Sequence, residues 1–411
     1  MSKHVKALVV GTSAAIAMSA SVFADDTTEI LNGQINLNAE VNAQLRVDAG
    51  ETGEATVASA AMANALNVET IAPHDVESTQ EFSGFVTSDA ETSVVSVDGT
   101  ALTASTAMGN AVTMDMTGDS DINATQTAGD GSNVYAGATL RVASYANSSV
   151  TASNAAANAI EVNAEGGSII GQLRQDSGAF VRAETVIDAP NAGMGWTAAV
   201  AATASGNSIQ TSGYDTSTIL DVEQANRGEI RAAARMTAGG GSRFTTVASQ
   251  AQGNGISVQN NYGYAHAQGG QDNTGNAEAV TDIELGNFDQ DSIFASSESM
   301  GNSALLSNIG GDVFLGLDQN NTGRIDSTTR FTGDDGGEVI GSASAFGNAL
   351  TGYTCNECPN THATGQVNQT NSGAVNSTFQ ATQQTGWGIT GGATAVGNSA
   401  SFVTTSPYND D

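Results

Sequence analysis

The two cysteines are the residues whose spacing most directly suggests chemistry. Cys355 and Cys358 form a Cys-x-x-Cys segment inside Thr354 to Pro359. A structural zinc site needs about four ligands, and the sequence has no second pair at a matching spacing. A thioredoxin-like redox pair needs a βαβ setting, which this sequence does not suggest. In an exported chain the pair favours a small disulfide between Cys355 and Cys358 that holds one loop.

Catalytic patterns are sparse in the rest of the sequence. No His-Glu-x-x-His, Gly-x-Ser-x-Gly or phosphate-binding glycine loop occurs. Arg227, Arg231 and Arg235 are the best basic cluster, and their spacing places them on one face of a strand. Enzymes that cleave polysaccharides on β-helices use such clusters, but a solvent-exposed ladder against nearby acids is the favoured interpretation. The other candidate bases are scattered in polar segments: His74, His266 and His362.

Acidic loops raise the question of calcium, which prefers oxygen ligands. They lie at residues 119–121, 130–131 and 334–338, and none has the EF-hand or glycine-rich nonapeptide spacing. Solvated turns are therefore expected, with no metal and no cofactor. Trp196 and Trp387 could stack on sugars, but isolated aromatics in such a chain are expected to be packing residues.

Composition points away from an ordinary globular domain. The 411 residues carry a formal net charge of -31, 48 glycines, 4 prolines and only 5% aromatics. Such a chain can fill a narrow core of small side chains but not a wide one. Disorder is the alternative, although charged residues are only 13% and β-branched residues occur throughout. Nucleic acid is not expected as a partner, because the chain has 43 acidic residues against 12 Lys and Arg, and Lys3 and Lys6 are its only lysines.

The N-terminal residues resemble a secretory leader. Lys3, His4 and Lys6 precede an apolar run of small residues from 7 to 22, and cleavage is expected after Ala24. A retained membrane helix is the alternative, but the run is short and alanine-rich. The predicted organisation is a signal peptide over residues 1–24 and one β-repeat domain over residues 25–411, exported to the cell surface.

Two sequence markers recur in phase. One is a run of Ala, Ser and Thr that ends in Gly-Asn or Ala-Asn, and the other is Gln followed by polar residues and Gly. Neighbouring copies are about 46 to 50 residues apart, which is typical of repeat proteins. The asparagines are Asn64, Asn110, Asn158, Asn207, Asn254, Asn302, Asn348 and Asn398. The glutamines are Gln80, Gln126, Gln175, Gln224, Gln271, Gln319 and Gln369, with Gln34 as a weaker first member.

The segments between the markers alternate with a period of two, which predicts strands with one buried face. Examples of the expected inward residues are Ile230, Ala232, Ala234 and Met236. Helix is the alternative for alanine-rich segments such as residues 58–66. The Gly-Asn pair is expected to form a corner, since both residues tolerate positive φ. Together these features predict an elongated β-solenoid of about eight repeats of about 48 residues, each forming two coils. Stacked markers would then form amide ladders.

These units resemble those of curlin-like and holdfast anchor protein D-like exported surface proteins. The resemblance rests on Gln-polar-Gly segments such as residues 369–373, on residues 393–399, and on the late Cys-x-x-Cys. It implies a non-enzymatic protein of the outer membrane that anchors an adhesive polysaccharide and supports surface attachment. Companion anchor subunits and a secretion lipoprotein would be its partners, and self-association is also expected. A polysaccharide-acting β-helix enzyme and a self-assembling curli-like fibre subunit are the alternatives.

Overall fold

The computed structural model describes residues 28–70, 74–241, 243–355 and 361–405. Within these ranges the protein consists of strands and connecting turns, with no helix, so the all-β prediction is confirmed. The predicted signal peptide lies outside the described residues. In the part of the chain that the structure describes, no helix is long and apolar enough to cross a membrane.

The fifteen strands of the described ranges belong to one sheet. They are Thr28–Thr52 (β1), Ala55–Thr70 (β2), His74–Thr117 (β3), Ser120–Ala128 (β4), Asn133–Ser177 (β5), Phe180–Asn226 (β6), Ile230–Gly240 (β7), Phe244–Asn261 (β8), Ala265–Asn273 (β9), Ala277–Ile309 (β10), Val313–Asn321 (β11), Ile325–Cys355 (β12), Ala363–Gly365 (β13), Asn368–Asn371 (β14) and Val375–Thr405 (β15).

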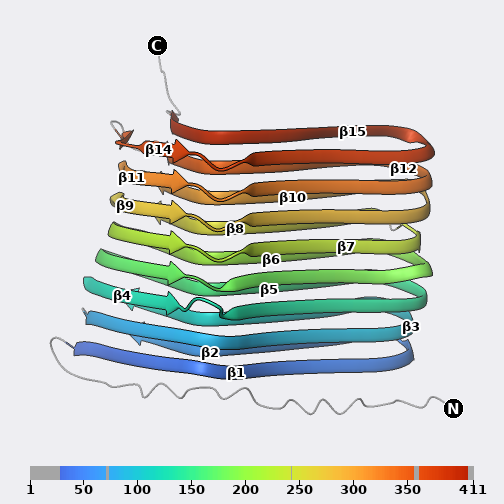
Figure 1. The fold of residues 1–411 in the computed structure, drawn as a ribbon, viewed down its shortest axis with the longest axis horizontal. Helices are drawn as coiled ribbons and strands as arrows, with labels where there is room; N and C mark the ends of the chain where they lie inside the picture. The colour runs from blue at the N-terminus through green and yellow to red at the C-terminus, as the bar shows by residue number, and fades with distance from the viewer. Residues whose placement is uncertain (1–27, 71–73, 242, 356–360, 406–411) are drawn as a thin grey trace.

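Every pairing in the sheet is parallel, and residues pair with equivalents one sequence unit away. Gln34 pairs with Gln80, and Asn302 pairs with Asn348. Figure 1 shows the result: stretches of chain lie one above another from β1 to β15, and each doubles back on itself. We call each such stretch a layer. Because the pairing offset equals the whole unit, each unit adds a single layer, and the prediction of two coils per unit is wrong.

Alternating side chains explain why these segments are strands. In β7, Ile230, Ala232, Ala234 and Met236 are all buried, as predicted. Arg231 and Arg235 lie between them on the outer face. The alanine-rich residues 58–66 lie within β2, so strand is the correct interpretation there and helix is wrong.

The described residues form two apolar clusters in the interior. The larger includes Val134, Leu140 and Ile187, and the smaller includes Leu173 and Leu220. Many members of the larger cluster are alanine or valine, which keeps the two facing walls of each layer close together. A thin interior is what the scarcity of large apolar residues predicts.

The Gly-Asn marker does not form the predicted positive-φ corner. The glycines of the marker, such as Gly206 and Gly253, are not among the residues with positive φ, and the strand continues through them. Glycine is needed there for close approach. A Cβ on Gly253 would lie 2.6 Å from the carbonyl oxygen of Gly301 and 2.3 Å from Oδ1 of Asn273.

Candidate functional site

The predicted marker glutamines lie directly above one another inside the protein. Nε2 of each donates to Oε1 of the glutamine in the preceding layer, at 2.7–2.9 Å, from Gln80 on Gln34 to Gln369 on Gln319. The second N–H of each amide donates across the interior to a backbone carbonyl of its own layer, as Gln224 does to Gly255 at 3.0 Å. We call this column the glutamine ladder.

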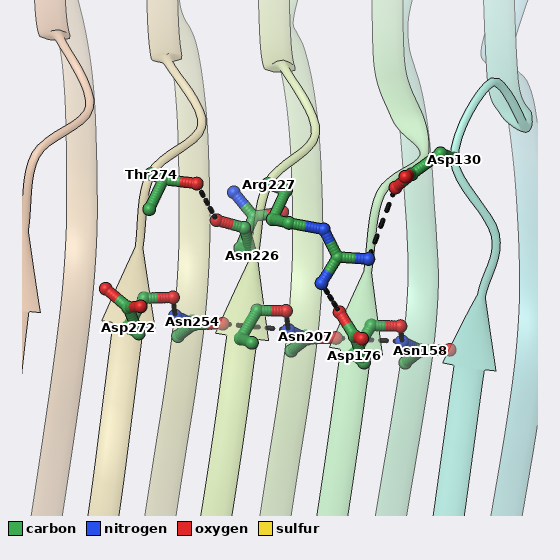
Figure 2. Close-up of polar contacts among 10 residues, drawn as sticks. Asp130, Asn158, Asp176, Asn207, Asn226, Arg227, Asn254, Asp272 and Thr274 are labelled. Carbon is green, nitrogen blue, oxygen red and sulfur yellow. Dashed lines mark hydrogen bonds and ion pairs between the residues drawn. The ribbon is translucent and has the colours of Figure 1, made fainter.

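The predicted marker asparagines form a second column, which runs in the opposite sense. Nδ2 of each donates to Oδ1 of the asparagine in the following layer, at 2.7–2.9 Å, from Asn64 on Asn110 to Asn348 on Asn398. The other N–H donates to the residue after a marker glutamine, as Asn207 does to the carbonyl of Ala225 at 2.7 Å. Figure 2 shows Asn158, Asn207 and Asn254 in line across neighbouring layers. We call this column the asparagine ladder.

Together the two ladders form a polar seam between the apolar clusters. Asn207 stands between Ala204 of the larger cluster and Ile209 of the smaller one. Asn207 and Gln224 are almost fully buried, yet both N–H groups of each amide are used. A buried amide is favourable only when it is satisfied in this way. The seam therefore fixes both the register between layers and the distance between the two walls.

A third column was not predicted. It consists of the asparagines two residues after a marker glutamine: Asn226, Asn273, Asn321 and Asn371. Nδ2 of Asn226, Asn273 and Asn321 donates to Oδ1 of the next asparagine at 2.7–2.8 Å. Nδ2 of all four also donates to the carbonyl of the glycine two residues later, as Asn273 does to Gly275. The sequence signal was the pattern Gln-x-Asn-x-Gly at the marker glutamines of these four layers, which the other marker glutamines lack.

The arginine cluster is paired with acids, as the favoured interpretation predicted. Arg227 reaches toward the preceding layers and contacts Asp130 and Asp176, with nitrogen–oxygen distances of 3.2 and 2.5 Å (Figure 2). Asp176 lies in the preceding layer and Asp130 in the layer before that, so the contacts of this one guanidinium span three layers. In the same way Arg231 contacts Glu278 at 3.2 Å, and Arg235 contacts Glu184 at 3.2 Å. These guanidinium groups join layers on the outer surface, and their charges are already matched.

The other predicted candidates lie apart from one another. His266 packs on Phe314 with ring centroids 4.6 Å apart. Asp119 accepts hydrogen bonds from the backbone and side chain of Ser168. Among the described residues, no group of three or more His, Cys, Asp or Glu side chains is arranged to hold a metal ion. Cys355 ends β12, whereas Cys358 lies outside the described residues, so their disulfide stays a prediction.

Both tryptophans are exposed, so the expectation that they are packing residues is wrong. Trp196 is 53% exposed and Trp387 is 73% exposed. The guanidinium of Arg243 lies over the Trp196 ring, 4.7 Å from its centroid.

One carboxyl group stands out on the outer surface. Glu298 lies in register between Gln250 and Ser344 of the adjacent layers. Burial raises the pKa of Glu298 above its ordinary value. The protein therefore holds this charge at some cost to folding stability.

A groove runs along the stack beside the glutamine ladder. It has a volume of about 700 Å³ and spans six layers, or roughly 24 Å at about 4.8 Å per layer. Its walls are the residues on either side of each ladder glutamine, among them Arg174, Asp176, Glu223, Ala225, Asp272, Asp318 and Asn320. The groove therefore presents a row of carboxylates and amides that repeats along the axis.

The family model for holdfast attachment protein D matches residues 49–325, which are more than half of the chain. No curated protein and no solved structure matches it. The chain belongs to the holdfast attachment protein D family.

Proposed function

We propose that this protein is a non-enzymatic, cell-surface β-solenoid of about eight layers that anchors a holdfast-type adhesive polysaccharide to the outer membrane. The observation that carries the proposal is the polar seam. Side-chain amides, buried from Gln80 to Gln319 and from Asn64 to Asn348, bind each layer to the next. Such a column resists sliding and separation of the layers, which suits a protein that transmits a pulling force.

We assign the polysaccharide to the groove beside the glutamine ladder. Its walls repeat once per layer, at a spacing close to the length of one sugar unit in an extended polymer. Carboxylates and amides such as Asp272 and Asn320 are the groups that hydrogen-bond sugar hydroxyls and amino groups. Many weak contacts along the axis would add up through multivalency. Export through the predicted leader, with a companion anchor subunit and a secretion lipoprotein, belongs to the same proposal.

Deleting the gene tests the anchoring role. Cells without the protein should still make the adhesive polysaccharide but should shed it into the medium, and unchanged retention would contradict the proposal. The groove is tested by Ala225→Trp, which places a large ring between its walls, with Thr246→Trp, an exposed position outside the groove, as the matched control. Shedding by the first variant alone supports the groove, whereas equal retention by both variants contradicts it.

A further inference from the structure

The two outer walls of the molecule differ in charge. Each layer turns back on itself at the right of Figure 1, and we call the halves of the layers that follow this turn the return wall. It consists of eight stretches that pair in register: residues 55–70, 101–117, 149–165, 197–214, 244–261, 292–309, 338–355 and 388–405. The chain has 43 acidic residues and 12 Lys and Arg, of which the return wall holds only six, all acidic. Almost all of the charge therefore lies elsewhere, as in the ion pair of Arg231 with Glu278 on the other wall.

The few charges of the return wall lie mainly at its margins. Five of the six acids are near the beginning or the end of their stretches: Glu69, Asp115, Glu161, Glu165 and Glu338. The sixth, Glu298, lies well inside its stretch. Soluble proteins usually carry charges at about a quarter or more of their surface positions, whereas the core of a protein interface is depleted of charge and its rim is polar. The return wall therefore has the charge pattern of an interface.

The return wall is also large enough to bind another protein. Its last five stretches measure roughly 24 Å along the stack and roughly 55 Å along the strands, at about 4.8 Å per layer and about 3.3 Å per residue. That area exceeds the roughly 800 Å² that each partner contributes to a standard interface. Within it, residues 197–214, 244–261 and 388–405 contain no charged residue.

A shallow trough of about 260 Å³ surrounds Glu298 in this wall. Its floor includes a column of small residues from four layers: Ala201, Ala248, Ser296 and Ser342. Phe294, four residues before Glu298 on the same face, is 43% exposed. No ion pair among the described residues includes Glu298, and burial raises the pKa of its carboxyl. The trough thus holds an unmatched carboxylate beside small side chains, and a long cationic side chain fits it because charge-assisted hydrogen bonds are about twice as strong as neutral ones.

We propose that the return wall is the docking surface for a different protein, which presents an uncharged β-sheet face and places one lysine or arginine side chain in the trough to pair with Glu298. Sheets pack face to face when the side chains between them interdigitate, and the column of alanine and serine leaves room for the long cationic side chain. A second copy of this chain cannot make the same contact through its own return wall, because that wall contains no Lys or Arg.

Site-specific photo-cross-linking in cells that make the full chain tests the inference. A photoreactive amino acid replaces Gln250, which pairs with Glu298 in register and lines the trough. The matched control replaces Thr328 in β12, which is half-exposed like Gln250 but lies on the other wall. Light should join the chain to one different protein from position 250 and not from position 328. The inference rests on the proposed function only for the cell-surface location. Because the readout is a cross-link and not retention of polysaccharide, docking can fail while the anchoring role stands.

Substitutions at Glu298 then test the predicted charge pair. Glu298→Gln and Glu298→Arg should both lower the yield of the cross-link, the second by roughly tenfold or more. Glu298→Gln separates docking from folding, because relief of the buried charge should stabilise the fold while the docking contact is lost. Once mass spectrometry identifies the joined protein, replacing its basic residue at the cross-link by Glu should restore the yield with Glu298→Arg.

Four results would overturn the inference: no product from position 250, equal products from positions 250 and 328, products that contain only this chain, or a yield that the Glu298 substitutions do not change. Failure of every basic residue of the joined protein to restore docking with Glu298→Arg would contradict the charge pair. The level of folded chain in each variant is measured in the same cells, so that a lower yield is not mistaken for loss of the protein.

Discussion

Asn110 donates from Nδ2 to Oδ1 of Asn158 at 2.8 Å, although 48 residues separate the two in sequence. Both side chains are fully buried. The same bond recurs from layer to layer, so the stability of the stack depends on each amide having a partner above and below.

Removing one amide from the middle of the column should be costly. In Asn207→Ala, Nδ2 of Asn158 loses its acceptor and Oδ1 of Asn254 loses its donor. Each buried group left without a partner costs about 1–3 kcal/mol of folding free energy. Asn163→Ala is the control, because that amide bonds an exposed carboxylate of Asp115 and should change stability by no more than about 0.5 kcal/mol. The two free energies of unfolding, measured with denaturant, should differ clearly. Equal losses would show that the ladder does not stabilise the fold.

The marker glycines should be coupled to the third column of asparagines. Gly253→Ala brings a Cβ against Asn273 and the backbone of Gly301, and crowding of this kind costs about 1–3 kcal/mol. In another layer, Ala157 occupies the position of Gly253 and Ser177 occupies the position of Asn273, so an alanine is accommodated where the facing residue is serine. The double variant Gly253→Ala, Asn273→Ser should therefore lose less stability than the two single losses added together. Additive losses in a double-mutant cycle would contradict this coupling.

Glu298→Gln should stabilise the protein at neutral pH. Because burial raises the folded-state pKa of Glu298, the folded protein holds the proton more tightly than the unfolded chain does. Stability then falls as pH rises from the unfolded pKa through the folded pKa. The variant should have a higher melting temperature than the wild type at pH 7, and this advantage should vanish at acidic pH, where the wild-type carboxyl is protonated. An advantage that is constant with pH would show that the charge is not its cause.

The arginine pairs on the surface should contribute little individually. Arg231→Gln removes one contact with Glu278, and the two side chains are 34% and 39% exposed. Exposed ion pairs of this kind contribute about 0–1 kcal/mol. The melting temperature should therefore fall only slightly, and the difference should shrink in high salt. A large loss that persists in high salt would instead indicate a packing role for the Arg231 side chain.

Much of this fold follows from the sequence because its signals are local and repeated. The alternation around Ile230 predicts a strand and its buried face, and the spacing of Gln224 and Asn207 identifies residues that stack. The repeat length of about 48 residues does not show how many coils one repeat forms. The sequence therefore does not distinguish one layer per repeat from two. The sequence also does not show why position 253 is glycine. A side chain there would collide with Asn273, and the two residues become neighbours only when the chain folds.

The central claim is that equivalent residues stack in one parallel column, and distances between paired spin labels test it most directly. Thr87, Glu278 and Asn376 occupy one outward column, with Glu278 four layers and Asn376 six layers from Thr87. In a background without native cysteines, labels at Thr87 and Glu278 should lie roughly 19 Å apart, and labels at Thr87 and Asn376 roughly 29 Å apart. Distances that do not increase in proportion to the number of layers would contradict the account.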